Sequence, residues 1–333
     1  MAHRATSTKK KKGSGFSASA LMDILASGRD SIDSMDAEVR IRVHVGSGCP
    51  RAMVLAAKEA LSAERPSGIV EVMGLDAPST SAADPGAVVM LAGADEPGAG
   101  PLVRFYLACG VPCAFVAESV LEAPSFGEDN DLYGVVCASS PDALPSKLAK
   151  WLSAHVENNI ALAANFAFCR EAVVDSLMGA CAVENAAIGA ISFIPGSDFP
   201  LMTASQAKLA LDIAAAYGCG LHPSRAAELA GVVGLGLVYR GVARTAAGLV
   251  PGFGWALKGA MGYAGTVATA KAVQARFEAE GKLGERRHDD SEHGAERPST
   301  PAVVRLPAAN ASTVSQPSPD NSEYLVIEGG DAR

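Results

Sequence analysis

The sequence predicts an α/β domain with a parallel, helix-covered sheet, followed by an all-α helical domain, with disordered segments at both termini. Over residues 39–153, short β-rich runs alternate with helical patterns, which is typical of a parallel sheet. Over residues 154–281 the strand pattern gives way to long runs of Ala, Gly and Leu. Such runs indicate a bundle of about five helices.

The first 38 residues are expected to form a polar arm and linker. They begin with a basic run at Lys9–Lys12, continue with a short amphipathic stretch at 21–25, and end in an acidic stretch at 30–36. At the other end, residues 282–333 are rich in Pro, Ser, Asn and charge, which predicts a disordered tail.

Apolar runs bounded by Gly and Pro give the expected strands of the α/β domain, at 39–46, 68–75, 86–93, 111–119 and 131–139. Helical patterns lie between or after them, at 50–64, 100–110 and 141–156. His44 alternates with Val43 and Val45 in the first run. We therefore expect His44 to face one side of an edge strand.

The turn after the first expected strand reads GSGCPRAM from Gly46. A phosphate-binding P-loop has the pattern G-x-x-x-x-G-K-[ST]. Counted from Gly46, the second glycine, lysine and hydroxyl positions hold Arg51, Ala52 and Met53, and Pro50 lacks a backbone N–H. The sequence therefore predicts no nucleoside triphosphate hydrolysis here, and more generally a protein that is not an enzyme and has no cofactor.

A dinucleotide-binding turn, G-x-G-x-x-G, is the alternative at the same place. Gly46 and Gly48 match its first two glycines, Arg51 replaces the third, and Glu71 lies near the position of a ribose-binding carboxylate. A Rossmann-type enzyme or sensor using these residues stays open as a second interpretation. Asp95-Glu96, after the third expected strand, is interpreted as a solvated loop.

The block PGSDFPLMTASQ, from Pro195 to Gln206, is expected to start a helix. Its Pro-Gly pair forms a turn, Ser197 or Asp198 can cap exposed N–H groups, and proline is tolerated in a first helical turn. A ligand or metal role for Asp198 with Thr203 and Gln206 is the alternative. The residues to which we assign this structural role are Pro195, Gly196, Asp198, Pro200, Thr203 and Gln206.

Residues 225–276 contain six basic residues and a single acid, Glu228, although the whole chain carries a net charge of −8. The basic residues are Arg225, Arg240, Arg244, Lys258, Lys271 and Arg276. Basic side chains on apolar helices suit an anionic lipid surface, and we assign the first five to membrane or partner contact. Charges interrupt each apolar run before it reaches the ~20 residues of a transmembrane helix.

The stretch from Ala161 to Phe277 resembles domain-of-unknown-function family 697, helical domains often attached to Era-like GTPase domains. The resemblance rests on ALAANFAFCREAVV, on the Pro195–Gln206 block and on the run from Arg225, RAAELAGVVGLGLVYRGVARTAAGLVPGFGWALKGAMGYAGTVATAKAV. It implies that residues 39–153 are a shortened, degenerate Era-like GTPase domain without a P-loop.

These observations predict a non-catalytic, pseudo-GTPase-like protein whose helical domain associates with a membrane or a protein partner. The acidic average argues against a specific nucleic-acid partner, and scattered cysteines without a C-x-x-C pair indicate reduced thiols. We expect a cytoplasmic protein at the inner face of the cell membrane. A third interpretation is a soluble module that self-associates into a homo-oligomer through small-residue helix faces.

Overall fold

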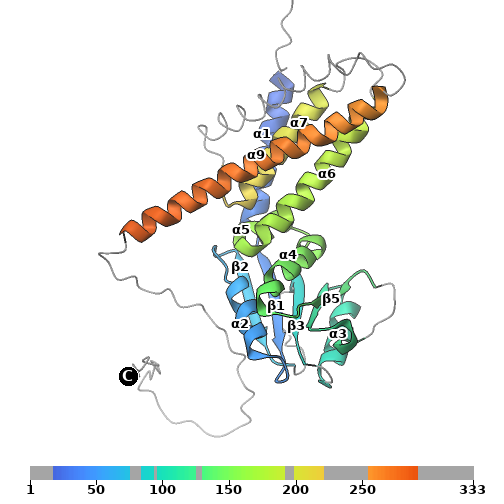
Figure 1. Cartoon of the computed structure of the whole chain (residues 1–333), viewed down its shortest axis with the longest axis vertical. Coiled ribbons are helices and arrows are strands. Elements are labelled where there is room, and N and C mark those ends of the chain that lie inside the picture. Colours follow the sequence, from blue (N-terminus) through green and yellow to red (C-terminus); the bar gives the residue numbers. More distant parts are fainter. Residues whose placement is uncertain are drawn as a thin grey trace, which may run out of the picture. The chain divides into compact units, whose positions relative to one another are not determined.

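A computed structural model describes residues 18–75, 84–93, 96–124, 130–191, 199–220 and 254–291. The arm before residue 18 and the tail after residue 291, both expected to be disordered, lie outside the described residues. All described residues belong to one compact unit. Figure 1 shows the sheet with its helices and the longer helices α1, α6, α7 and α9.

All the expected strands form, and they pair in one parallel sheet of order β2-β1-β3-β4-β5. The strands are β1 (Val39–Val45), β2 (Gly68–Met73), β3 (Ala87–Leu91), β4 (Cys113–Ala117) and β5 (Tyr133–Cys137). Strands β3 and β4 are buried along their whole length, as expected for a sheet with helices on both faces. The prediction of an α/β region followed by helices is confirmed.

Helices cover the two faces of the sheet. The helices of this region are α2 (Arg51–Ala60), α3 (Ala99–Ala108) and α4 (Leu144–His155), with short 3-10 turns η1 (Val120–Glu122) and η2 (Pro141–Ala143). Met53 of α2 and Leu148 of α4 pack with Val43 on one face. Val103 and Tyr106 of α3 pack with Met90 on the other.

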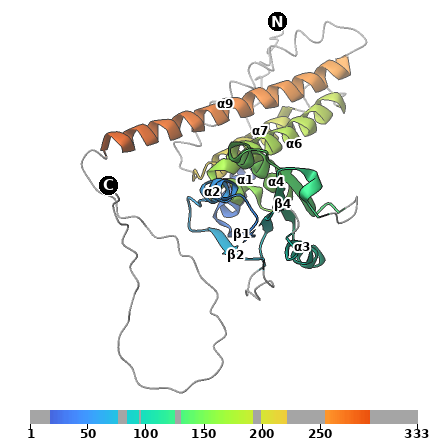
Figure 2. The ribbon, with the colours of Figure 1, turned by 60° about the horizontal axis from the view of Figure 1, so that its bottom comes forward.

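The helical region contains α5 (Asn159–Asn165), η3 (Ala167–Cys169), α6 (Arg170–Ile191), α7 (Phe199–Ala216) and α9 (Gly254–Ser291). The amide N–H of Ala161 donates to the side chain of Asn158, which caps α5. Just after the end of α7, Gly218 has a φ of +72°, which suits glycine. The N–H groups of Gly218 and Cys219 donate to the carbonyls of Ala215 and Ala214, in the hydrogen-bond pattern of a Schellman motif. Figure 2 shows α6 and α9 side by side.

Two predicted boundaries differ from the structure. The acidic stretch expected to be a linker at 30–36 is the end of helix α1 (Ala18–Asp36), which packs against α5 and α7. Helix α9 continues to Ser291, past the predicted end of the helical domain at 281. In addition, one continuous core joins Val43 and Leu148 to Val173 and Phe277, on both sides of the predicted boundary at 153/154.

Candidate functional site

The sheet order identifies the place where an α/β fold of this type binds ligands. In a doubly wound sheet of order 2-1-3-4-5, ligands lie beyond the carboxyl ends of β1 and β3, where the chain turns to opposite faces. Here those ends continue into the loop Gly46–Pro50 and into Ala92-Gly93, with Glu96 shortly after. The turn singled out in the sequence therefore lies at the expected ligand position.

The carboxylate of Glu96 occupies this turn. Its Oε1 accepts from the Gly48 N–H at 2.8 Å and the Ser47 hydroxyl at 3.1 Å, and its Oε2 accepts from the Gly93 N–H at 2.9 Å. A Cβ added to Gly46 would lie 1.8 Å from Oε2, so the loop closes tightly around this carboxylate. Glu96, interpreted as part of a solvated loop, is instead the acceptor on which the loop donors converge.

These contacts change the acidity of Glu96. Partial burial raises its pKa, but the hydrogen bonds from Gly48, Gly93 and Ser47 outweigh burial and hold the pKa below its ordinary value. Glu96 is therefore ionised at neutral pH. An anionic ligand that used the same donors would have to displace it.

Glu96→Gln is expected to lower the free energy of unfolding by about 1 kcal/mol at pH 7, because an amide offers only one acceptor oxygen to these donors. A carboxyl whose folded pKa is depressed stabilises above its unfolded pKa and loses that contribution as pH falls through its folded pKa. The difference in stability between Glu96→Gln and the unmodified chain should therefore decrease as the pH falls below the ordinary glutamate pKa. Urea unfolding across that pH range measures this difference. The control is Glu59→Gln, at an exposed position of α2, which is expected to leave the stability unchanged.

The residues at the P-loop positions counted from Gly46 lie at the start of α2. Met53, at the magnesium-binding hydroxyl position, points into the hydrophobic core, and Pro50 precedes the first residue of α2. Among the described residues, no group of three or more His, Cys, Asp or Glu side chains could hold a metal ion.

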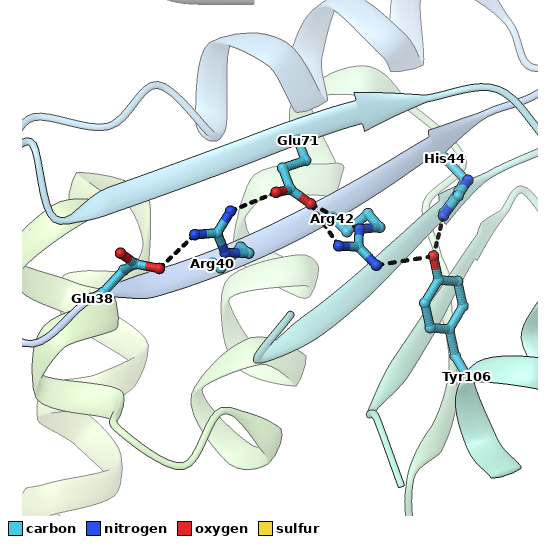
Figure 3. Close-up of polar contacts among 6 residues, drawn as sticks. All are labelled: Glu38, Arg40, Arg42, His44, Glu71 and Tyr106. Atoms are coloured by element: carbon cyan, nitrogen blue, oxygen red, sulfur yellow. Dashed lines mark hydrogen bonds and ion pairs between the residues drawn. The ribbon is translucent and has the colours of Figure 1, made fainter. Parts of the chain in front are cut away.

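The third dinucleotide candidate, Glu71, lies within β2 and is held by two arginines of β1 (Figure 3). Its oxygens pair with Arg40 Nη1 at 2.5 Å and with Arg42 Nη2 at 2.8 Å. Burial raises the pKa of Glu71, but the two arginines outweigh it and keep the pKa below its ordinary value. The structure thus joins Gly46 and Gly48 to Glu96, while Glu71 pairs with Arg40 and Arg42.

His44 continues the same polar row, and its predicted edge position is wrong because β1 lies between β2 and β3. The ring is fully buried, and its Nδ1 lies 2.6 Å from the Gly74 carbonyl oxygen. Its Nε2 lies 2.8 Å from the Tyr106 hydroxyl (Figure 3). Since a carbonyl only accepts, Nδ1 carries the proton and Nε2 accepts from Tyr106. Burial lowers the His44 pKa, so the ring is neutral and serves as a structural link between β1 and α3.

A groove of about 370 Å³ opens beside Glu96, between β4, α3 and η1. Prolines and aliphatic side chains, including Pro97, Pro101 and Leu121, form much of its lining, together with the charged residues Glu96, Arg104 and Glu122. Its size is that of a small-molecule site.

In the helical region, the predicted helix start is found only in part. Pro195, Gly196 and Asp198 lie outside the described residues, and Pro200 is the second residue of α7, where proline is tolerated. Thr203 and Gln206 are buried on α7. Gln206 Nε2 lies 3.2 Å from Thr266 Oγ1 of α9, so this residue links two helices and does not form part of a cap or turn at the start of α7.

Sequence reasoning missed the centre of this buried polar cluster, Asn185 of α6. Its amide donates to Thr266 Oγ1 at 3.0 Å and accepts from the Ser205 hydroxyl at 2.8 Å. The cluster joins α6, α7 and α9. The available sequence signal was an Asn within a mostly apolar helical run, and such a residue does not predict which distant side chains it contacts.

Among the predicted contact residues, Arg225, Arg240 and Arg244 lie outside the described residues. Lys258 and Lys271 are on α9, where Lys258 is half-buried and Lys271 is exposed. Lys271 pairs with Asp175 of α6 at 2.8 Å. Arg276, also counted in the basic segment, pairs with Glu280 at 3.3 Å.

One helical stretch in the described part of the chain, Ala167–Ile191, is long and apolar enough to cross a membrane. This finding concerns length and composition alone, and core helices of soluble proteins can share both features. It includes all of α6, and only 28% of its most apolar window is buried within the protein.

Comparison with protein-family models, with curated proteins and with solved structures finds no match for this chain. The class that the structure defines is a doubly wound parallel α/β sheet joined to a helical bundle. The resemblance to family 697 and to Era-like GTPase domains stays a prediction.

Proposed function

We propose that this chain is a non-catalytic, pseudo-GTPase-like protein that associates with an anionic membrane surface at the inner face of the cell membrane. In this proposal the α/β region is a platform and the helical region makes the contact. The occupied turn supports the first part, because Glu96 takes the donors that a phosphate would otherwise use. The basic segment 225–276 supports the second.

The observation that carries the proposal is the exposure of α6. A soluble core helix of such composition is normally covered, but most of the apolar window of α6 is not buried within the protein. Two large apolar side chains on it, Val183 and Ile191, are exposed. Exposed apolar surface of this kind marks a site of contact with lipid or protein.

Co-sedimentation with vesicles tests the proposal. The full chain is expected to bind vesicles containing phosphatidylserine more strongly than vesicles of phosphatidylcholine alone, and to lose binding as salt rises. Since each basic residue near an anionic surface contributes about 1 kcal/mol, Arg240→Glu/Arg244→Glu should weaken binding at least tenfold.

The matched control is Arg51→Glu/Lys58→Glu, which makes the same charge change at exposed positions of α2. It is expected to bind like the unmodified chain. Absence of binding to both vesicle types, or equal loss in the two double variants, would overturn the proposal.

Self-association is the second candidate function, and α9 provides the observation that favours it. Alanines recur every four residues on its exposed face, at Ala256, Ala260, Ala264, Ala268 and Ala272. Small residues allow close approach of a second helix. A stable oligomer in sedimentation velocity without lipid, together with no vesicle binding, would favour this candidate over the membrane proposal.

A further inference from the structure

Three helix ends meet at one end of the bundle. Gly189 near the end of α6 approaches the backbone of Lys258 near the start of α9, and Gly262 of α9 approaches both Asn185 of α6 and Met202 of α7. The last turns of α6 and the first turns of α7 and α9 therefore lie together. We call this the bundle tip, comprising residues 184–191, 199–202 and 254–263.

The opposite end of the bundle is anchored to the α/β region. Arg170, the first residue of α6, pairs with Glu64 after α2, and its guanidinium lies 5.7 Å from the ring centre of Tyr217. Val173 and Val174 are fully buried in the core that also contains Leu148 of α4. This end of α6 cannot enter lipid without breaking that core.

The anchor limits how far α6 can reach into a bilayer. From Asp175 to Ile191 the helix rises by about 24 Å at ~1.5 Å per residue, which is less than the ~30 Å hydrocarbon core. This stretch also includes the Asp175–Lys271 ion pair and the exposed Glu184. A charge inside the bilayer costs several kcal/mol, so α6 is unsuited to crossing it.

Exposed apolar side chains instead gather at and beside the bundle tip. Among the described side chains of α6, α7 and α9, the large exposed hydrophobic ones are Val183, Ile191, Leu201 and Tyr263. Ile191 and Leu201, on the last turn of α6 and the first turn of α7, are 68% and 59% exposed. By sequence, Trp255 is the second residue of α9.

Glu184 and Tyr263 indicate how deeply the tip can enter a bilayer. Glu184 lies about 10 Å from Ile191 along the axis of α6, and Tyr263 follows Gly262, which touches Asn185 at the same level. Tyrosine favours the membrane–water interface, and carboxylates remain in water. Beyond this level the described part of the tip carries one charged residue, Lys258, whose long side chain can reach back to the headgroups. The depth of about 10 Å from Glu184 to Ile191 matches the ~5–10 Å that interfacial helices bury.

We infer that the bundle tip inserts into one leaflet of an anionic bilayer, to the level of Glu184 and Tyr263, and does not cross the membrane. This inference rests on the proposed membrane association and adds its mode: Ile191, Leu201 and the start of α9 enter the acyl region, while the α/β region stays in water. The basic residues of 225–276 then add attraction to the headgroups.

The two tryptophans of the chain provide the test. Trp255 lies in the bundle tip, whereas Trp151 lies in α4 and stacks on His155 at 4.2 Å. Full-length Trp151→Phe reports on Trp255, and Trp255→Phe reports on Trp151. With vesicles of brominated phosphatidylcholine and phosphatidylserine, Trp255 fluorescence should be quenched most by bromines near the headgroup end of the acyl chains, and Trp151 should not be quenched.

Substitutions locate the contact. Burying a large aliphatic side chain contributes about 1.5–3 kcal/mol, so Ile191→Glu and Leu201→Glu should each weaken vesicle binding about tenfold or more. Leu121→Glu changes an equally apolar and more exposed residue of the α/β region and should bind unchanged. Circular dichroism identifies any variant that fails to fold, and quenching in the Trp151→Phe chain does not depend on the tip substitutions.

The outcomes separate the inference from the proposed function. Vesicle binding without quenching of Trp255, or equal quenching of both tryptophans, overturns tip insertion and leaves membrane association standing. Quenching of Trp255 mainly by bromines near the bilayer centre also overturns the one-leaflet mode. Absence of vesicle binding overturns both.

Discussion

Arg42→Met is expected to lower the free energy of unfolding by about 3 kcal/mol. The Arg42 side chain is 4% exposed and pairs with Glu71, which is 22% exposed, and its Nη1 lies 3.4 Å from the Tyr106 hydroxyl. Removing one member of a buried ion pair costs about 3–5 kcal/mol, because the remaining charge loses compensation. The lower end of that range applies, because Glu71 is partly exposed and keeps Arg40 as a partner.

Urea unfolding at pH 7 measures this loss. Arg65→Met is the matched control, since Arg65 pairs with Asp36 where both side chains are more exposed, and surface pairs contribute at most about 1 kcal/mol. The Arg42→Met deficit should also shrink as pH falls through the depressed pKa of Glu71, because a protonated carboxyl no longer needs the arginine. Equal losses in the two variants would contradict this account of Arg42.

Gly262→Ala is expected to destabilise the protein by about 2–3 kcal/mol, although alanine favours a helix. An added Cβ would lie 2.5 Å from the Asn185 carbonyl oxygen and 2.9 Å from Met202 Cε. The first of these is backbone, so α6 and α9 would have to separate. Separation would also strain the hydrogen bond between Asn185 and Thr266.

Gly179→Ala is the control for this prediction. Gly179 is also a mid-helix glycine, on α6, and an added Cβ there meets no atom within 4 Å. It should stabilise the protein by about 0.5–1 kcal/mol through helix propensity alone. Thermal unfolding of the two variants measures the difference, and a stabilised Gly262→Ala would show that α6 and α9 do not pack as closely as the structure has them.

Strands β3 and β4 were predictable as short apolar runs, which fit a sheet buried on both faces, and β1 was predictable from its alternation of apolar and polar residues. The place of β1 in the sheet, and with it that of His44, was not predictable from the sequence. Its alternation with Val43 and Val45 correctly predicts that it faces one side of the sheet, but a strand does not record which strands lie beside it. The same alternation covers Arg40 and Arg42, and this row of polar residues was a signal for a buried network.

In helix α1 the sequence pattern predicted too little structure. Its acidic end looks like a solvated linker, yet Met35 is buried with Ile160 of α5 and Ala215 of α7. Ser31 donates to the buried Asp212 at 2.6 Å, and Asp212 also pairs with Lys208. Among the described side chains of α1, at 26 and 28–36, only a few face the protein, so the average polarity of this stretch does not reveal that it packs.

The turn after β1 shows most clearly what the local sequence determines and what depends on tertiary packing. Counting residues from Gly46 is sufficient to exclude a P-loop, because the missing lysine and hydroxyl are local to the turn. The occupant of that turn, Glu96, comes from the loop after β3, nearly fifty residues along the chain. Local patterns thus locate the strands, the helices and the absence of P-loop residues, since each depends on neighbouring residues. Packing alone determines that Glu96 fills the turn, that Arg42 pairs with Glu71 and that apolar side chains gather at the bundle tip, since these depend on which distant segments meet.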